Sequence, residues 1–186
     1  MKSEVEKAVN VIKNGGVILY PTDTIWGLGC DPTNEDAIQK LLDLKKRAPG
    51  KSFILLVHNE ALLQRYVKEI PPICYDLIDH STRPLTIIYP QGQYVSNQVI
   101  APDGSIAIRI TQDPFCKELT RVLKHGIVST SANVSQQPYS NDIRNLPAAI
   151  RENVDYIVNL PLKNENAPPS QIIKVGLDGE INIIRK

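Results

Sequence analysis

Residues 127–133 are IVSTSAN, a short apolar segment that runs directly into small hydroxyl-bearing residues and ends at Asn133. The apolar segment predicts a strand over 127–129, and open α/β sheets bind ligands at the carboxyl ends of their strands. Serine, threonine and asparagine side chains offer neutral hydrogen-bond donors and acceptors at short reach. They are also ordinary turn residues, so the segment by itself favours a plain loop over a binding site.

Apolar periodicity on both sides of this segment predicts alternating strands and helices. Short apolar runs indicate strands at 17–20, 53–57, 85–89, 105–110, 127–129 and 156–158, and 170–175 pairs with 180–184 in a closing hairpin. Helical spacing indicates helices near 3–14, 33–47, 60–66, 72–78, 113–125 and 146–151. Ser3 with Glu6 is expected to cap the first helix, and Thr33 with Asp36 the second. The alternation predicts an α/β fold with a mixed sheet.

The composition is that of an ordinary globular protein. The chain has 186 residues, of which 42% are hydrophobic and 22% charged, so we expect one domain over 1–186. A net charge of +1 excludes a strong overall field that would attract nucleic acid or a membrane. The widely spaced Cys30, Cys74 and Cys116 are expected to be reduced core residues. The first residues show no signal-type apolar segment, so we expect a cytoplasmic protein.

A local cluster of cations follows the second predicted helix and comprises Lys45, Lys46, Arg47 and Lys51. Cations near a helix C-terminus are favoured by about 0.3–1 kcal/mol. Four cations in seven residues exceed that need, so a phosphate-binding patch is an equally good interpretation. Arg109 lies among the apolar residues of a predicted strand and therefore needs a partner or a ligand.

Two glycines, Gly27 and Gly29, follow the polar segment PTDT at 21–24. Glycines in an apolar run indicate that the backbone passes close to a ligand or to another strand. The third glycine of a dinucleotide fingerprint is missing, and there is no GK[ST] motif. A nucleotide would therefore be bound by neither common loop. Asp23 is expected to close a turn rather than bind a metal, and Trp26 is either a wall of a site or part of the core.

Several of these segments together resemble the YrdC-domain family, whose established members are threonylcarbamoyl-AMP synthases. The segments are PTDT at 21–24 with WGLG at 26–29, KxR at 45–47 with Lys51, PLT at 84–86, Arg109, and STSAN at 129–133. They occur in the family's order, and 170–185 resembles the family's closing hairpin. The resemblance implies a YrdC-like twisted mixed parallel and antiparallel sheet flanked by helices, with an open, positively charged groove, in a single YrdC-like domain over 1–186.

The resemblance also implies a reaction. L-threonine, bicarbonate and ATP give threonylcarbamoyl-adenylate and pyrophosphate, and a separate tRNA threonylcarbamoyl transferase complex uses the adenylate to form threonylcarbamoyladenosine in tRNA. Mg²⁺ is expected to accompany ATP, with the phosphates supplying most of its ligands, and no bound organic cofactor is expected. The basic groove is also a candidate surface for tRNA or double-stranded RNA.

By the same resemblance, the site residues form three sets and include no metal ligand. The catalytic set around the reacting phosphate is Lys45, Arg47, Ser131 and Asn133. The ATP-binding set is Arg47, Lys51, Ser105, Ser131 and Arg185. The threonine-binding set is Thr24, Arg109 and Ser129. Cations suit the charge that develops on phosphoryl oxygens, and an arginine suits the bidentate binding of a carboxylate.

Two other functions stay open at this point. One is a double-stranded RNA-binding module without enzymatic activity, which the near-neutral charge and the 5% aromatic content disfavour. The other is a diverged nucleotide-binding paralogue that uses a different acceptor. His58, His80 and His125 are isolated and are expected to be surface or capping residues rather than catalytic bases.

Overall fold

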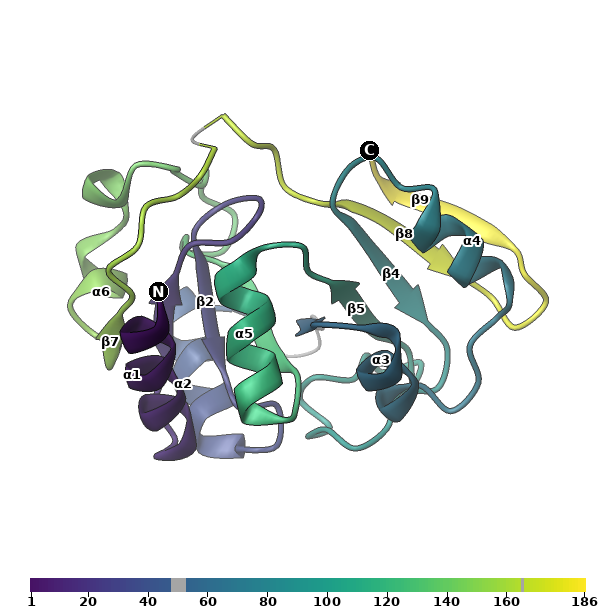
Figure 1. The fold of residues 1–186 in the computed structure, drawn as a ribbon, viewed down its shortest axis with the longest axis horizontal. Helices are drawn as coiled ribbons and strands as arrows, with labels where there is room; N and C mark the ends of the chain where they lie inside the picture. Colours follow the sequence, from purple (N-terminus) through teal and green to yellow (C-terminus); the bar gives the residue numbers. More distant parts are fainter. Residues whose placement is uncertain (48–52, 165) are drawn as a thin grey trace.

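A nine-stranded mixed sheet forms the centre of the computed structural model, which describes residues 1–47, 53–164 and 166–186. Its strands lie in the order β7-β1-β2-β6-β3-β5-β4-β8-β9, with the β8–β9 hairpin at one end (Figure 1). The strands are β1 (Ile18–Tyr20), β2 (Gly27–Cys30), β3 (Ile54–Val57), β4 (Leu85–Tyr89), β5 (Ile106–Ile110), β6 (Ile127–Ser131), β7 (Tyr156–Ile157), β8 (Gln171–Val175) and β9 (Ile181–Arg185). The pairs β1–β7, β3–β5 and β4–β8 are parallel and the others antiparallel. The predicted mixed α/β sheet is confirmed.

Helices cover both faces of the sheet and bury two apolar clusters. On one face, α1 (Lys2–Lys13) and α5 (Pro114–Leu123) pack side by side over Ile18, Leu56 and Ile127 (Figure 1). The second cluster lies against the opposite face and involves α2 (Glu35–Lys45), α3 (Glu60–Tyr66), α4 (Ile73–Asp79) and α6 (Ala148–Arg151), with the short 3-10 helix η1 (Ile143–Asn145) before α6. The two clusters separate because successive strand residues point to opposite faces.

Only half of the first face is covered by α1 and α5. Side chains farther along the sheet that point the same way, such as Ile88, Ala107 and Ile172, line a cavity instead of the helix-covered cluster. The register explains this, because Ala107 pairs with both Ile54 and Ile88, which also line the cavity. The uncovered half of this face is therefore the place for a ligand.

The two glycines of β2 allow a tyrosine ring to lie under the strand. A Cβ atom on Gly29 would lie 2.8 Å from Cε1 of Tyr20 and 2.8 Å from the carbonyl oxygen of Val128. A Cβ on Gly27 would lie 3.4 Å from Cζ of the same ring. The close neighbour predicted from these glycines is thus the buried Tyr20 ring together with the backbone of β6.

Three local predictions were wrong. Helix α1 begins at Lys2 with Met1 as its N-cap, so Ser3 lies inside the helix and caps nothing. Helix α2 is capped by the side chain of Asn34, which accepts a hydrogen bond from the amide of Ala37, whereas Thr33 bonds to Asp31. Strand β6 continues to Ser131, because 128–131 pair with β2 in register, so most of the hydroxyl segment is strand and not loop.

The cysteines and the helices show two simple properties of the fold. All three cysteines are buried and free, as expected for core residues, and burial raises the pKa of the Cys74 thiol to about 11. Within the described part of the chain, no helix is both long and apolar enough to cross a membrane.

Candidate active site

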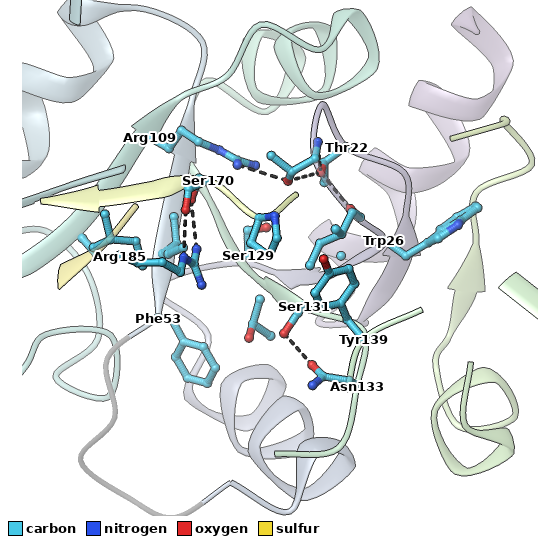
Figure 2. A pocket seen from close by; sticks show the side chains of 18 of the residues that line it. Thr22, Trp26, Phe53, Arg109, Ser129, Ser131, Asn133, Tyr139, Ser170 and Arg185 are labelled. Carbon is cyan, nitrogen blue, oxygen red and sulfur yellow. Dashed lines mark hydrogen bonds between the residues drawn. The ribbon is translucent and has the colours of Figure 1, made fainter. Parts of the chain in front are cut away.

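A cavity of about 460 Å³ occupies the uncovered half of the sheet face (Figure 2). Its walls come from the PTDT segment, β2, β3, β4, β5, the end of β6, the segment around Tyr139 and the β8–β9 hairpin. The polar side chains that line it are Thr22, Thr24, Arg47, Arg109, Ser129, Thr130, Ser131, Asn133, Tyr139, Ser170 and Arg185. Seven of the residues predicted for the three sets, namely Thr24, Arg47, Arg109, Ser129, Ser131, Asn133 and Arg185, are brought together here.

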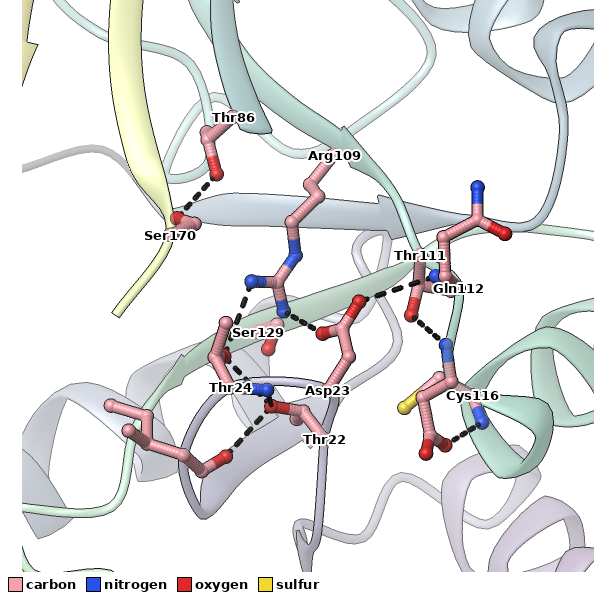
Figure 3. Close-up of polar contacts among 12 residues, drawn as sticks. Thr22, Asp23, Thr24, Thr86, Arg109, Thr111, Gln112, Cys116, Ser129 and Ser170 are labelled. Atoms are coloured by element: carbon pink, nitrogen blue, oxygen red, sulfur yellow. Dashed lines mark hydrogen bonds and ion pairs between the residues drawn. The ribbon is translucent and has the colours of Figure 1, made fainter. Parts of the chain in front are cut away.

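Arg109 enters the cavity from β5 and is held by the PTDT segment (Figure 3). One guanidinium nitrogen, Nη1, donates to Oγ1 of Thr24 at 3.2 Å, and the other, Nη2, lies 3.1 Å from Oδ1 of Asp23. The Arg109 side chain is 5% exposed, and among the described residues nothing accepts from its buried Nε. Asp23 therefore supplies the partner that a charged residue on this strand required, and Nε is left as a donor.

The PTDT segment is rigid because its hydroxyls bond to one another. Thr22 Oγ1 lies 2.9 Å from Thr24 Oγ1 and donates to the carbonyl oxygen of Ile25 at 2.8 Å. Asp23 accepts from the amide of Gln112, just after β5, at 3.2 Å. Asp23 lies in a bend at 23–25, and its contacts are this hydrogen bond and the ion pair with Arg109.

Arg185 reaches the cavity from β9. Its Nε donates to the carbonyl oxygen of Ser170 at 2.8 Å, and the Ser170 hydroxyl lies 2.8 Å from Oγ1 of Thr86. The register of β8 and β9 shifts between Ile172 and Ile173, so Ile184 is an extra residue in β9. Bulges of this kind redirect side chains, and both Ile184 and Arg185 line the cavity. Burial and the nearby Arg109 lower the pKa of Arg185, which means that an anion between the two arginines would relieve their repulsion.

Arg47 forms the third cationic wall. Its guanidinium carbon lies 4.9 Å from the centre of the Phe53 ring, and Nη1 donates to Oγ1 of Thr130 at 3.4 Å. Stacking on an aromatic face leaves the edge of a guanidinium available for an anion. Burial lowers the pKa of Arg47 from its ordinary value, although an arginine remains charged at neutral pH.

Lys45 lies behind the cavity rather than in its wall. It is 2% exposed, and its Nζ donates to the carbonyl oxygens of Ser131 and Asn133 at 2.5 and 2.7 Å and to Oδ1 of Asn133 at 3.2 Å. Its own carbonyl oxygen accepts from the amide of Ser135. Burial, and then Arg47, lower the pKa of Lys45 to about 7, whereas three acceptor oxygens favour the ammonium form. The structure thus makes Lys45 a clamp on 131–135.

Ser131 and Asn133 line the cavity but already bond to each other. Ser131 Oγ donates to Oδ1 of Asn133 at 2.5 Å, and Asn133 Nδ2 donates to the carbonyl oxygen of Gln137. In this arrangement the Ser131 hydroxyl can only accept from a ligand. The amide group of Asn133 retains one N–H, so it is the donor of this pair that can meet a phosphate or carbamate oxygen.

Besides Lys45, one described residue of the predicted sets, Ser105, does not line the cavity. Ser105 precedes β5, where its hydroxyl donates to Oδ1 of Asp103 at 2.6 Å. Lys51 lies outside the described residues. Ser129 is in place, and its Oγ accepts from the buried hydroxyl of Tyr20 at 2.7 Å.

Sequence reasoning missed several members of the site. Ser170 orients Arg185, Asp23 orients Arg109, and Tyr20 supports Ser129. Only Asp23 carried a usable signal, because a carboxylate in a short polar segment between two threonines is a chemically suitable partner for a strand arginine. Trp26 is both core and wall, with its Nε1 donating to the carbonyl oxygen of Asn141 at 3.1 Å.

The electrostatics of the cavity favour an anion with several charges. Three guanidinium groups line it, and none of its described lining residues is an aspartate or a glutamate. Moreover, no group of three or more histidine, cysteine or acidic side chains suited to a metal ion occurs in 1–47, 53–164 or 166–186. The lining therefore suits phosphates and carboxylates, and it does not offer a metal cage of its own.

The chain is similar to several known proteins. A family model for Sua5/YciO/YrdC proteins, described as telomere recombination, matches residues 10–186. Threonylcarbamoyl-AMP synthases of Coxiella burnetii and Pseudoalteromonas translucida are each 32% identical to it, with coverage of 95% and 97% of both chains in each pair. A third, from Idiomarina loihiensis, is 37% identical over 83% of this chain and 84% of its own length.

Solved structures show the same fold at lower identity. E. coli YciO aligns with a TM-score of 0.86 at 22% identity, over 100% of this chain and 90% of that one. P. abyssi Sua5 complexed with L-threonine aligns with a TM-score of 0.82 at 22% identity, over 92% of this chain and 50% of that one.

Proposed function

The chain belongs to the Sua5/YciO/YrdC family, and from this premise we propose that it is a threonylcarbamoyl-AMP synthase. It is a nucleotidyltransferase that forms threonylcarbamoyl-adenylate and pyrophosphate from L-threonine, bicarbonate and ATP, and its product serves the threonylcarbamoyladenosine modification of tRNA. Full-length relatives at 32–37% identity carry this name. We also propose that residues 1–186 act as one YrdC-like domain, since one sheet runs from β7 to β9.

The observation that supports the proposal most directly is the set of arginines in the cavity. Arg47, Arg109 and Arg185 come from three separate segments and line one cavity whose described lining holds no carboxylate. A triphosphate and an amino-acid carboxylate together carry enough negative charge to balance the three arginines. The charge of Arg109 is offset by a protein carboxylate, Asp23, which suits it to the smaller charge of threonine.

The proposed reaction uses two groups of residues that line the cavity. Threonine and bicarbonate first give a carbamate and water. An oxygen of the carbamate then bonds to the α-phosphorus of ATP while the bond to the leaving pyrophosphate breaks. Thr24, Ser129 and Arg109 hold threonine, with Arg109 on its carboxylate. Arg47 and Arg185, together with Lys51, hold the phosphates and stabilise the charge on the departing oxygens.

Ser131, at the end of β6, and Asn133 line the same cavity as these two groups of residues. Asn133 donates to an oxygen of the carbamate or of the α-phosphate, and Ser131 keeps the Asn133 side chain oriented. Lys45 acts through this pair, because its ammonium contacts the loop and not the cavity. Alignment of the reacting atoms is a large part of the rate enhancement in such reactions. Ser105 does not line the cavity, so we assign it no role in ATP binding.

Mg²⁺ would arrive with ATP. The residues around the cavity supply amides, hydroxyls and guanidinium groups rather than carboxylates, so the phosphate oxygens would supply most of the metal's ligands. We assign no chemical step to the metal.

One assay tests the proposal against both alternatives. The protein is incubated with ATP, labelled bicarbonate and single amino acids, and pyrophosphate and the adenylate are followed. Threonine-dependent release of both products supports the synthase. Release with another amino acid only would identify a diverged paralogue, and silence with salt-sensitive binding of double-stranded RNA would identify an RNA-binding module.

Variants connect the activity to this cavity. Arg47→Ala is expected to lower the rate by about one to three orders of magnitude, because a lost transition-state contact is worth roughly 2–4 kcal/mol. Arg121→Ala is the matched control, since Arg121 lies on α5 in an exposed ion pair with Glu118. Equal activities of the two variants would contradict the assignment.

A further inference from the structure

A second cavity lies on the opposite face of β4 and β5 from the first. It has a volume of about 250 Å³ and lies where α4 and the segment 81–84 meet the sheet. Its apolar walls are Ile78, Leu85, Ile87, Ile108 and Ile110, and its polar groups are Asp23, Ser81, Thr82, Arg83, Tyr89 and Gln112. Pockets for drug-sized ligands measure roughly 300–1,000 Å³, so this cavity suits a smaller molecule.

Three polar groups give the cavity a defined chemistry. Arg83 is exposed, and no described residue hydrogen-bonds or ion-pairs with its guanidinium. The backbone at this point is held by the Ser81 hydroxyl, which donates to the Arg83 carbonyl oxygen at 2.6 Å. Tyr89, from β4, also lines the cavity and is 1% exposed, so its hydroxyl is the second polar group here.

The third polar group, Asp23, joins the two cavities. Its carboxylate lines the second cavity, while Arg109, which lies 3.1 Å from it, lines the first. Each carboxylate oxygen has a further lone pair, so Asp23 can accept from a ligand without releasing Arg109. The ion pair is thus the partition between the cavities, and charge placed beside Asp23 in one cavity changes the electrostatics of the other.

We propose that the second cavity binds an α-amino acid with an aliphatic side chain. The ammonium group would lie against Asp23, the carboxylate against Arg83, and the branched side chain against the isoleucines below. A nucleotide is excluded because the cavity is small and has one arginine. Neutralising Asp23 from this side makes Arg109 more positive toward the first cavity. This consequence, unlike the binding itself, rests on the proposed function: the amino acid would tighten the binding of threonine.

Calorimetry without ATP tests the site independently of the reaction. L-leucine is titrated into the wild-type protein, and two analogues, isocaproate without the ammonium group and isopentylamine without the carboxylate, are titrated in parallel. We expect leucine to bind with a Kd on the order of 0.1–1 mM and both analogues to bind at least about tenfold more weakly, which is a loss of about 1.4 kcal/mol.

Two variants show where the ligand lies. Arg83→Ala and Ile110→Phe should each weaken leucine binding at least about tenfold, while Arg121→Ala leaves it unchanged. Saturating threonine should not displace leucine. If Arg83→Ala binds leucine as well as the wild type does, or if threonine displaces leucine completely in both, leucine binds in the first cavity and the proposal is overturned. Failure of leucine to bind at all overturns it too.

Steady-state kinetics then test the coupling. Leucine is expected to lower the KM for threonine several-fold in the wild type and to have no effect in Arg83→Ala. An unchanged KM in the wild type would refute the coupling. If leucine binds in an Arg83-dependent way but the protein releases no pyrophosphate, the second site stands and the proposed function fails, so the two failures are distinguishable.

Discussion

Replacing Lys45 with methionine separates a residue that touches substrate from one that positions a loop. Methionine keeps most of the length of the side chain and removes the ammonium group. The change removes the shared donor of three part-buried oxygens, namely the carbonyl oxygens of Ser131 and Asn133 and Oδ1 of Asn133. The Ser131 carbonyl keeps its bond from the Asn133 amide, and Oδ1 keeps its bond from Ser131 Oγ. An acceptor that loses its partner costs about 1–3 kcal/mol when it is buried, so the Asn133 carbonyl carries most of the loss.

The expected loss of stability is smaller than the sum of three such terms. Removing the ammonium also removes the cost of burying a charge in a side chain that is 2% exposed. We therefore expect Lys45→Met to lower the free energy of unfolding by about 2–4 kcal/mol. The oriented Asn133 amide is lost with it, so adenylate formation should fall by about one to two orders of magnitude.

The assay combines urea unfolding with pyrophosphate release. Lys46→Met is the matched control, because Lys46 is the exposed neighbour on the same helix end, and it should change neither quantity. The pH dependence adds an independent readout. The folded state holds the pKa of Lys45 at about 7, below its ordinary value of 10.5, so the unfolded chain binds more protons in that window. The unfolding free energy of the wild type should therefore rise relative to that of Lys45→Met as the pH rises through it.

A different result would refute this reasoning. If Lys45→Met kept the stability of the wild type and lost activity as strongly as Arg47→Ala, then Lys45 would contact the substrate phosphates directly. If both stability and activity were unchanged, the three contacts of its ammonium group would be irrelevant to the site.

Three further predictions concern other parts of the molecule. Glu4→Gln should flatten the acid dependence of stability, because hydrogen bonds from Tyr156 first, and from Asn159 and Lys7, lower the pKa of Glu4 from 4.5 to about 2. Above pH 4.5 the Glu4 carboxylate contributes up to about 3 kcal/mol to the unfolding free energy of the wild type, and this contribution is lost as the pH falls from 4.5 to about 2. Urea unfolding at several pH values measures it. Gly29→Ala should destabilise the fold by about 1–3 kcal/mol in the same assay, since the new Cβ would meet a backbone oxygen at 2.8 Å. Arg109→Lys should raise the KM for threonine about 10- to 100-fold in the pyrophosphate assay, because one ammonium cannot replace the guanidinium fork; an unchanged KM would place threonine elsewhere.

The sequence predicted helix ends best where a residue type favours a single position in the helix. Helix α5, predicted near 113–125, begins at Pro114 after the Asp113 cap, since proline at the first helical position and an aspartate before it act within a single turn. The cap of α2 was misplaced by one residue, because Thr33 and Asn34 are both good caps and only the bond to Asp31 decides between them.

The candidate site could be predicted in its members better than in their arrangement. Arg109 needed a partner, but the partner, Asp23, lies 86 positions earlier in the chain and could be paired with it only once the end of β1 and strand β5 were placed in one sheet. The role of Lys45 changed for the same reason, since its sequence neighbours are cations whereas its contacts are oxygens at 131 and 133.

By itself the sequence determined the mixed α/β class, most strands, the family resemblance and the identity of seven residues that line the cavity. The fold class and the strands depend on local periodicity and on residue chemistry, which act over a few positions, whereas the site residues follow from the resemblance to the family's motifs. Only the tertiary structure decided that Lys45 clamps a loop, that Ser105 lies apart, that Asp23 joins two cavities, and that the hydroxyls at 130 and 131 belong to a strand. Those outcomes depend on strand register and sheet order, which bring together residues far apart in the chain and which no local pattern encodes.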